Sequence, residues 1–422
     1  MVERLKKLLT LPSLILVGIL LLAAFLRLYR IGDYMTFLGD EGRDVLVVWN
    51  ILHGHPTLLG PNASVGGFFL GPIYYYFMTP FLWIFNYNPV GPAVMVALFG
   101  IATVWLVYFI GSKFFNARVG LIAAFLYTIS PIIIAYSRSS WNPNPLPFFS
   151  LSLLYFVYKG IEKKNWKYIL LSGIFLGIAM QLHYLATFLA TIVFMYILTS
   201  YIYETCAKHT KIFHYLIPAI KTYFIYFGGF LLGWSLFLLF EIRHGFNNTK
   251  DILNFVFHSK ETGVGQQFNT IINDVFFRIF GRLVTAFPPP EQVNFHTSCG
   301  LAIWYFATLL LGILSVGLLF YFLIKNWKKH ELFLQYSLLT IWLIVGVLLF
   351  GFYKKSIYDY YFAFLFPLPF LLVGSLLGWM FSKKHVWTPT SIGRVSGEIN
   401  HIHETSTMGP TRISHKIGKF KN

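Results

Sequence analysis

Four charged side chains lie within five positions of the stretch "FLGDEGRDVLVVW" (37–49), namely Asp40, Glu41, Arg43 and Asp44. On a helix that begins at position 39 or 40, residues 40, 43 and 44 share one face, because side chains three and four positions apart are neighbours. Glu41 is turned about 100° away from that face, so the two adjacent acids meet different surroundings. Such a cluster can also be a helix cap with a surface ion pair, but its position directly after an apolar segment favours chemistry.

Polar side chains also interrupt four later apolar regions, each near the end of an expected helix. They are Arg138, Asn142 and Asn144 in "AYSRSSWNPNPLPFF" (135–149), His183 and Tyr184 in "GIAMQLHYLATF" (177–188), Glu241, Arg243 and His244 in "LFEIRHGFNNTKD" (239–251), and Lys354, Lys355 and Asp359 in "FGFYKKSIYDYYFAFLFP" (350–367). Polar groups near membrane depth are costly and usually mark a site. Amides can both donate to and accept from a hydroxylated ligand. Arg138 could instead snorkel to the headgroups, and His183 with Tyr184 could belong to an interfacial belt.

The composition places these groups in a membrane protein. Of 422 residues, 56% are hydrophobic and 12% are charged, whereas about a quarter of the residues of an average soluble domain are charged. We expect roughly ten spanning helices, within a range of about nine to twelve. They lie near 9–28, 91–111, 118–136, 145–159, 168–183, 185–203, 222–241, 300–324, 332–352 and 361–381. The sequence therefore predicts an all-α, polytopic membrane protein whose spans close their backbone hydrogen bonds internally.

Lysine and arginine residues predict the orientation of these spans. With the N-terminus in the cytoplasm, every inner connection carries lysine or arginine, as the positive-inside tendency requires. Topology thus explains most of the net charge of +17, and we expect no nucleic-acid partner. Both termini are predicted to be cytoplasmic, and the first span is expected to stay as an uncleaved anchor in the cell membrane. Cys206 and Cys299 fall on opposite sides, so they should not form a disulfide.

Two outer segments, 29–90 and 242–299, are long. The first contains an amphipathic stretch with Val45, Val48, Trp49 and Leu52 on one helical face, followed by "GGFFLGPIYYYFMTPFLWIF" (66–85). Its aromatic composition is typical of helices at the membrane interface, although the length would also allow an eleventh span. We expect one transmembrane domain over 1–385 and a disordered cytoplasmic tail over 386–422.

Basic residues on the outer side run against the positive-inside tendency and call for an anionic ligand. They include Arg43, Arg138, Arg243, Lys354 and Lys355, and arginine forks and lysine point charges are how proteins bind phosphate. We therefore predict a polar, mixed-charge outer cavity for an anionic lipid headgroup. The sequence contains no GxxxxGK[ST] loop, HExxH or CxxC motif that would favour other chemistry.

The order of these motifs resembles the GT-C membrane glycosyltransferases of the protein O-mannosyltransferase and lipid A aminoarabinose transferase type, that is, dolichyl-phosphate-mannose-protein mannosyltransferase-like enzymes. The resemblance rests on the outer D-E-x-R, "GPIYYY" (71–76), "NARVGLIAAFLYTISP" (116–131) and "YSRSSWNPN" (136–144). It implies a polyprenyl- or dolichyl-phosphate sugar as donor, a protein, lipid or glycan acceptor on the extracytoplasmic side, and inversion at the anomeric carbon.

The resemblance also implies roles for single residues. Asp40 corresponds to the acid that acts as general base on the acceptor hydroxyl or orients it, Glu41 to the adjoining acid, and Arg43 to a residue that contacts the donor phosphate. A divalent metal bound by Asp40 and Glu41 stays possible, and no other cofactor is expected. Tyr74, Tyr75, Asn142, Asn144, His183, Tyr184, Glu241, His244 and Asp359 are the substrate-binding candidates.

Two departures from the family pattern stand out. Leu70, Gly71 and Pro72 replace the Lys-Pro-Pro that often precedes the aromatic pair, so Arg138, Arg243 or Lys354 would have to supply that cation. The second outer loop offers Asn142 and Asn144 in place of an aspartate, so Asp40 would act as the only base.

Two alternatives to a transferase are a transporter or flippase of lipid-linked saccharides and a non-catalytic scaffold. Transporters place their sites near the bilayer midplane on broken helices, whereas the ionisable groups here gather at outer span ends. A scaffold would tolerate the loss of Asp40 and Arg43 alike.

Overall fold

The computed structural model describes residues 10–63, 66–209, 211, 213–258, 268–289, 292–293, 298–353 and 357–382. Within these ranges the chain is helical, and its one β-bridge pairs Asn62 with Phe69. The predicted all-α fold is therefore confirmed. The predicted tail, 386–422, lies outside the described residues.

The helices follow the order of the predicted segments. The first outer segment contains α3 (Ile31–Tyr34), α4 (Gly39–Leu52) and α5 (Ile73–Ile84), and the second contains α14 (Asn247–His258) and α15 (Phe268–Gly281). The predicted spans correspond to α2 (Leu11–Leu28), α6 (Val90–Phe114), α7 (Ala117–Ile129) with α8 (Pro131–Tyr136), α9 (Leu146–Glu162), α10 (Trp166–Leu182), η1 (Tyr184–Ala186) with α11 (Thr187–Ala207), α12 (Phe213–Gly233) with α13 (Ser235–Arg243), α16 (Cys299–Lys325), α17 (His330–Leu348) with η3 (Leu349–Phe352), and η4 (Asp359–Leu365) with α18 (Pro367–Met380).

Six helices in the described part are long and apolar enough to cross a membrane: α2, α6, η1 with α11, α12, α16, and α17 with η3. A seventh span would join η4 to α18 across a bend of 63°. The remaining predicted spans coincide with shorter helices, such as α7 and α10. The protein is thus a multi-pass membrane protein, while a total of about ten crossings stays a prediction.

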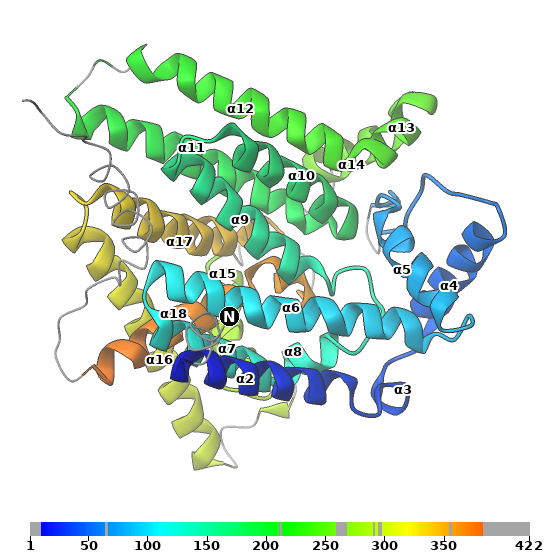
Figure 1. Ribbon diagram of the computed structural model, residues 1–422, viewed down its shortest axis with the longest axis horizontal. Coiled ribbons are helices and arrows are strands. Elements are labelled where there is room, and N and C mark those ends of the chain that lie inside the picture. The colour runs from blue at the N-terminus through cyan, green and yellow to red at the C-terminus, as the bar shows by residue number, and fades with distance from the viewer. Residues whose placement is uncertain are drawn as a thin grey trace, which may run out of the picture. The chain divides into compact units, whose positions relative to one another are not determined.

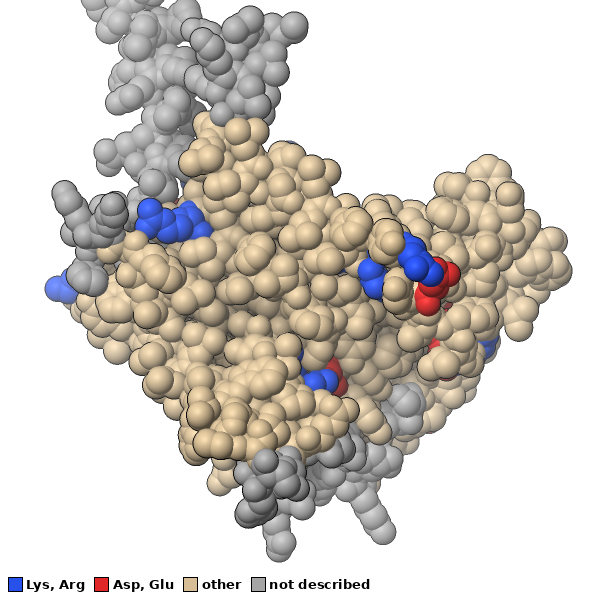
Figure 2. All heavy atoms as spheres, turned by 90° about the horizontal axis from the view of Figure 1, so that it is seen from below, with Lys and Arg blue, Asp and Glu red and all other residues tan. Residues whose placement is uncertain are grey.

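The outer surface agrees with a membrane setting. In the face drawn in Figure 2, charged side chains are confined to a few small groups, and uncharged residues cover the rest of the described surface. Exposed large apolar side chains occur along α2, α12 and α16. Exposure of this kind would be unfavourable in water and is expected where helices contact lipid.

Proline residues lie between α8 and α9, where the site is built. α8 ends at Tyr136, and α9 begins at Leu146 with Pro145 as its N-cap residue and Pro147 in its first turn. Because proline lacks a backbone N–H and disfavours helix at the preceding residue, the intervening segment leaves the helix and forms a loop. The predicted interruption is confirmed.

α4 and α5 lie next to each other at the end of the bundle where α6 begins (Figure 1). α4 begins at Gly39 as predicted, but its buried face consists of Glu41, Asp44 and Val48. Trp49 of the predicted apolar face is 44% exposed and stacks on His53 at 3.8 Å between ring centroids. Positions three and four residues apart starting from Glu41 form the face that packs inward. Contact of Val45, Val48, Trp49 and Leu52 with the membrane interface stays a prediction.

α10 and α12 pack against each other along their length (Figure 1). Gly173 and Gly177 of α10 face Gly229 and Gly233 of α12, and a Cβ atom on Gly229 would lie 2.2 Å from the carbonyl oxygen of Leu170. Small residues at this four-residue spacing let the two backbones come into direct contact. This packing places the C-terminal end of α10, with His183 just beyond it.

Candidate active site

A cavity of about 250 Å³ brings together segments that are far apart in the sequence. Its lining residues are Asp40, Arg43, Asn62, Ala63, Leu70, Trp141, Asn142, Pro143, His183, Tyr184 and Tyr360. Five of the predicted site residues therefore line one space, and they come from α4, from the loop between α8 and α9, and from the turn after α10.

Arg43 lies between the carboxylates of Asp40 and Asp44 on α4. Its Nη1 donates to Asp40 Oδ1 at 2.9 Å, and its Nη2 and Nε donate to Asp44 Oδ1 at 2.7 and 3.0 Å. The side chains of Asp40 and Arg43 are 55% and 40% exposed, whereas that of Asp44 is fully buried. The buried Asp44 thus holds the guanidinium of Arg43 in place, and the carboxylate of Asp40 remains open to the cavity.

Asp44 is a buried acid with an unusual ionisation. The hydroxyl group of Tyr75 donates to Asp44 Oδ1 at 3.2 Å, and Oδ2 is buried with no hydrogen-bond partner among the described residues. Burial raises the pKa of Asp44 from 3.8 to about 6, although the adjacent Arg43 opposes the shift. The charge of Asp44, the buried partner of Arg43, therefore changes near pH 6.

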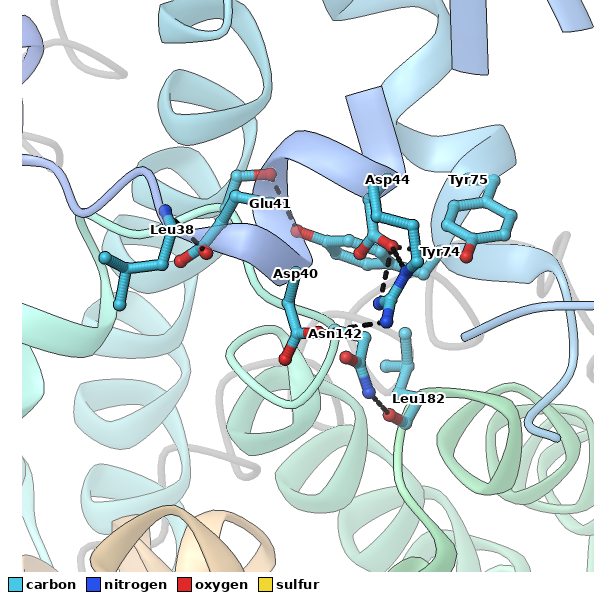
Figure 3. A network of polar contacts seen from close by, with 10 residues as sticks. Leu38, Asp40, Glu41, Asp44, Tyr74, Tyr75, Asn142 and Leu182 are labelled. Carbon is cyan, nitrogen blue, oxygen red and sulfur yellow. Dashed lines mark hydrogen bonds and ion pairs between the residues drawn. The ribbon is translucent and has the colours of Figure 1, made fainter. Parts of the chain in front are cut away.

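Glu41 points away from Asp40, into the contact between α4 and the loop after α8 (Figure 3). Its Oε1 accepts from Ser139 Oγ at 3.0 Å and from Thr36 Oγ1 at 3.1 Å, and its Oε2 accepts from the backbone N–H of Leu38 at 3.0 Å. This last hydrogen bond joins the backbone of the N-cap residue to an acid at the third helical position. It is one half of a capping box. Glu41 thereby fixes the start of α4 and does not line the cavity.

The loop between α8 and α9 is held by hydrogen bonds on both sides. Asn142 Nδ2 donates to the carbonyl oxygen of Leu182 at 2.6 Å (Figure 3), and Asn144 Nδ2 donates to that of Ser139 at 2.8 Å. Tyr74 and Ser140 share a hydrogen bond of 2.9 Å between their hydroxyl groups. Asn142 therefore joins the loop to the end of α10 while its side chain also lines the cavity.

His183 supplies a neutral group to the cavity wall. Its Nδ1 accepts from the backbone N–H of Leu185 at 3.3 Å, so the hydrogen of the neutral ring lies on Nε2. Burial lowers the pKa of His183 to about 3. The ring stacks on Tyr184 with 4.6 Å between centroids and contacts Tyr360 edge-on. His183 is thus a fixed hydrogen-bond donor and carries no charge.

Several predicted site residues lie elsewhere. Arg138 lies over the ring of Tyr34 at 5.1 Å. Glu241 is buried, and its Oε2 accepts from the backbone N–H of Thr249 at 3.0 Å, while His244 contacts the carbonyl oxygen of Phe240. These residues, together with Arg243, do not line the cavity. Lys354 and Lys355 lie outside the described residues.

Asp359 is held by two arginines, Arg278 in α15 and Arg282 directly after it. Arg282 Nη2 lies 2.8 Å from Asp359 Oδ2, and Arg278 Nη1 lies 3.5 Å from Oδ1. Neither arginine was predicted as a site residue, because both lie within the second outer segment rather than at the end of a span. Their pairing with Asp359 joins α15 to η4, whose Tyr360 lines the cavity.

A second connection, which the sequence did not predict, supplies another part of the cavity wall. Residues 60–63 pair with 68–70 through backbone hydrogen bonds, including Gly60 N–H to Leu70 O at 2.9 Å. The side chain of Asn248 in α14 accepts from Phe69 N–H at 2.6 Å and donates to Phe69 O at 3.1 Å. α14 thus holds the loop that supplies Asn62, Ala63 and Leu70 to the wall.

The two acids do not converge as metal ligands would. Asp40 is directed to Arg43 and Glu41 to Ser139, and no group of three histidine, cysteine, aspartate or glutamate side chains suited to a metal occurs in the described part of the chain. Since a bound cation needs several converging oxygen or nitrogen atoms, these residues do not fit the metal site considered from the sequence.

Comparison with known proteins adds a family pattern and a fold. The family model for dolichyl-phosphate-mannose-protein mannosyltransferase matches residues 70–226. No curated protein matches the sequence. The archaeal oligosaccharyltransferase AglB from Archaeoglobus fulgidus, solved with an inhibitory peptide and a dolichol-phosphate, aligns with a TM-score of 0.54 at 15% identity, covering 96% of this chain and 52% of AglB.

A second solved structure is ArnT from Cupriavidus metallidurans bound to undecaprenyl phosphate. It aligns with a TM-score of 0.55 at 14% identity, covering 86% of this chain and 60% of ArnT. This chain therefore spans about half the length of AglB, and identities this low establish a shared fold alone. The chain has the fold of the GT-C membrane glycosyltransferases, and its residues 70–226 carry the sequence pattern of the dolichyl-phosphate-mannose-protein mannosyltransferase family, which confirms the resemblance drawn from the sequence.

Proposed function

We propose that the protein transfers a sugar from a polyprenyl-phosphate donor to an acceptor hydroxyl on the extracytoplasmic face, with inversion at the anomeric carbon. The observation that carries the proposal is the exposed carboxylate of Asp40 beside the half-exposed guanidinium of Arg43 on the wall of one cavity. The polyprenyl phosphates bound by AglB and ArnT support the class of donor.

Asp40 is proposed as the general base. Among the described contacts only its Oδ1 is bonded to Arg43, which leaves Oδ2 to accept the proton of an acceptor hydroxyl. The hydroxyl oxygen forms a bond to the anomeric carbon, and the bond from that carbon to the phosphate oxygen breaks with its electron pair on the phosphate. One displacement of this kind inverts the configuration.

Arg43 is proposed to stabilise the phosphate charge as the leaving group departs. Its exposed ion pair with Asp40 is weak in water, so a donor phosphate can displace the carboxylate, while the buried Asp44 keeps the guanidinium in place. Asn142 and His183 would bind sugar hydroxyl groups from the opposite wall. Glu41 is proposed to position α4. A cavity of about 250 Å³ lies at the small end of ligand pockets, which favours a single sugar.

The test compares Asp40→Asn with Asp33→Asn in a deletion strain. Asp33 forms the same kind of exposed ion pair, three residues after Arg30 at 2.7 Å, but does not line the cavity. Removal of a general base should lower transfer about a hundredfold or more, so mass spectrometry should show the modified glycan missing and the lipid-linked donor accumulating for Asp40→Asn alone.

Other outcomes would assign other functions. If Asp40→Asn restores the glycan as well as wild type does, Asp40 is not the base and the transfer mechanism fails. If both Asp40→Asn and Arg43→Ala leave glycans unchanged while deletion removes them, a scaffold explains the phenotype. If the donor disappears from one leaflet in the deletion strain, the protein is a flippase.

A further inference from the structure

A second and larger cavity, of about 520 Å³, opens at the other end of α10. Trp166, the first residue of α10, lines this cavity, whereas the last residue, Leu182, adjoins the Asp40 cavity. A helix of this length spans about 25 Å, close to the thickness of about 30 Å of a bilayer's hydrocarbon core. In the predicted topology the two cavities therefore lie at opposite faces of the membrane.

The second cavity is cationic at its mouth. Lys164, Lys208 and Lys221 line it together with one carboxylate, Glu204. Glu204 already pairs with Lys164 at 3.5 Å, Lys208 at 3.3 Å and His330 at 3.5 Å. Lys221 on α12 has no ion-pair partner in the described part of the chain. Three lysines against one acid leave an excess of positive charge that a bound anion would neutralise.

The deeper wall of the cavity is apolar. Ile161, Ile169 and Ile225 line it from α9, α10 and α12, and the hydroxyl groups of Tyr201 and Thr222 are bonded to each other at 2.7 Å rather than free. Trp166 is exposed at the rim, as tryptophan residues at the headgroup level often are. A cationic entrance above an apolar wall fits an amphiphilic anion better than a soluble anion.

We propose that this cavity binds the phosphate headgroup of an anionic lipid, with Lys208 and Lys221 contacting the phosphate and the isoleucine wall contacting the acyl chain. Basic pockets between spanning helices are known to bind acidic headgroups. The site lies at the far end of α10 from Asp40, so the inference does not rest on the proposed transferase activity.

The test measures binding of radiolabelled dioctanoyl phosphatidic acid to the full-length protein in neutral detergent. Arg43→Ala protein serves as the background, so that an anion bound near Asp40 does not contribute. Each lysine near a membrane surface contributes enough to change affinity about fivefold, so Lys221→Gln and Lys208→Gln should each weaken binding by about that factor. Lys221→Arg should retain it.

Lys163→Gln is the matched control. Lys163 is next to Lys164 and 61% exposed, but it does not line the cavity, so its loss should change binding less than twofold. An equal loss with Lys163→Gln, or equal competition by dioctanoyl phosphatidylcholine, would overturn the proposal. If glycerol phosphate or inorganic phosphate competes as well as phosphatidic acid, the ligand is a soluble phosphate and the lipid assignment fails.

Discussion

At the scale of single residues, the ionisation of Asp44 determines whether Arg43 has a buried anionic partner. It is fully buried, it holds the guanidinium at 2.7 Å, and its pKa is raised to about 6 by burial. Because the folded protein then takes up a proton at a higher pH than the unfolded chain, the free energy of unfolding falls as pH rises from about 4 to about 6. Ionised Asp44 costs stability, and the ion pair with Arg43 offsets part of this cost.

The activity should follow this ionisation in the opposite direction. Below pH 6 Asp44 becomes neutral and Arg43 loses its anionic partner, so kcat/KM should fall to about a tenth of its plateau by pH 5. Asp44→Asn should have low activity and no inflection near pH 6, whereas Asp33→Asn should keep the wild-type profile. An inflection at pH 6 that persists in Asp44→Asn would assign it to another group.

Several residues around the cavity could be predicted from spacing alone. The rotation of about 100° between neighbouring helical residues separated Asp40 from Glu41, and the structure places them in different surroundings. Charged residues with no evident partner in the sequence were weaker indicators of the site. Glu241 and Asp359 were predicted to bind substrate, but they contact Thr249 and Arg282. Nothing local in the sequence specifies the partner of Asp359, which lies 77 residues away.

At the scale of elements, α10 positions His183 at the cavity because its glycines pack directly against α12. Gly228 and Gly229 offer a matched pair in α12: a Cβ atom on Gly228 meets nothing within 4 Å, whereas one on Gly229 would lie 2.2 Å from the carbonyl oxygen of Leu170. Gly229→Ala must therefore separate the helices, at about 1–3 kcal/mol. Gly228→Ala should be neutral or stabilising by up to about 1 kcal/mol, since alanine favours helix.

Thermal unfolding in detergent, followed by circular dichroism, checks this pair. A lower midpoint is expected for Gly229→Ala only, with reduced activity because the turn at His183 follows the end of α10. Equal midpoints for the two variants would show that the close helix contact does not stabilise the fold.

Helix ends were more predictable than the number of crossings. Proline residues and the charged cluster marked the starts of α4 and α9 at the level of single residues. Apolar length did not separate spanning helices from buried ones, because helices such as α9 and α18 are buried within the protein along most of their length. Burial in protein and burial in lipid select the same residue types.

At the scale of the whole molecule, the orientation can be tested with the two cysteines. Cys206 near the end of α11 and Cys299 at the start of α16 are both free and exposed. The lysine and arginine distribution predicts that Cys206 lies inside and Cys299 outside. In intact cells a membrane-impermeant maleimide should therefore label the Cys206→Ser protein through Cys299. It should label the Cys299→Ser protein only after the membrane is permeabilised. The reverse pattern would place Asp40 in the cytoplasm and the lysine-lined cavity outside, and both proposed sites would then face the wrong lipids and substrates.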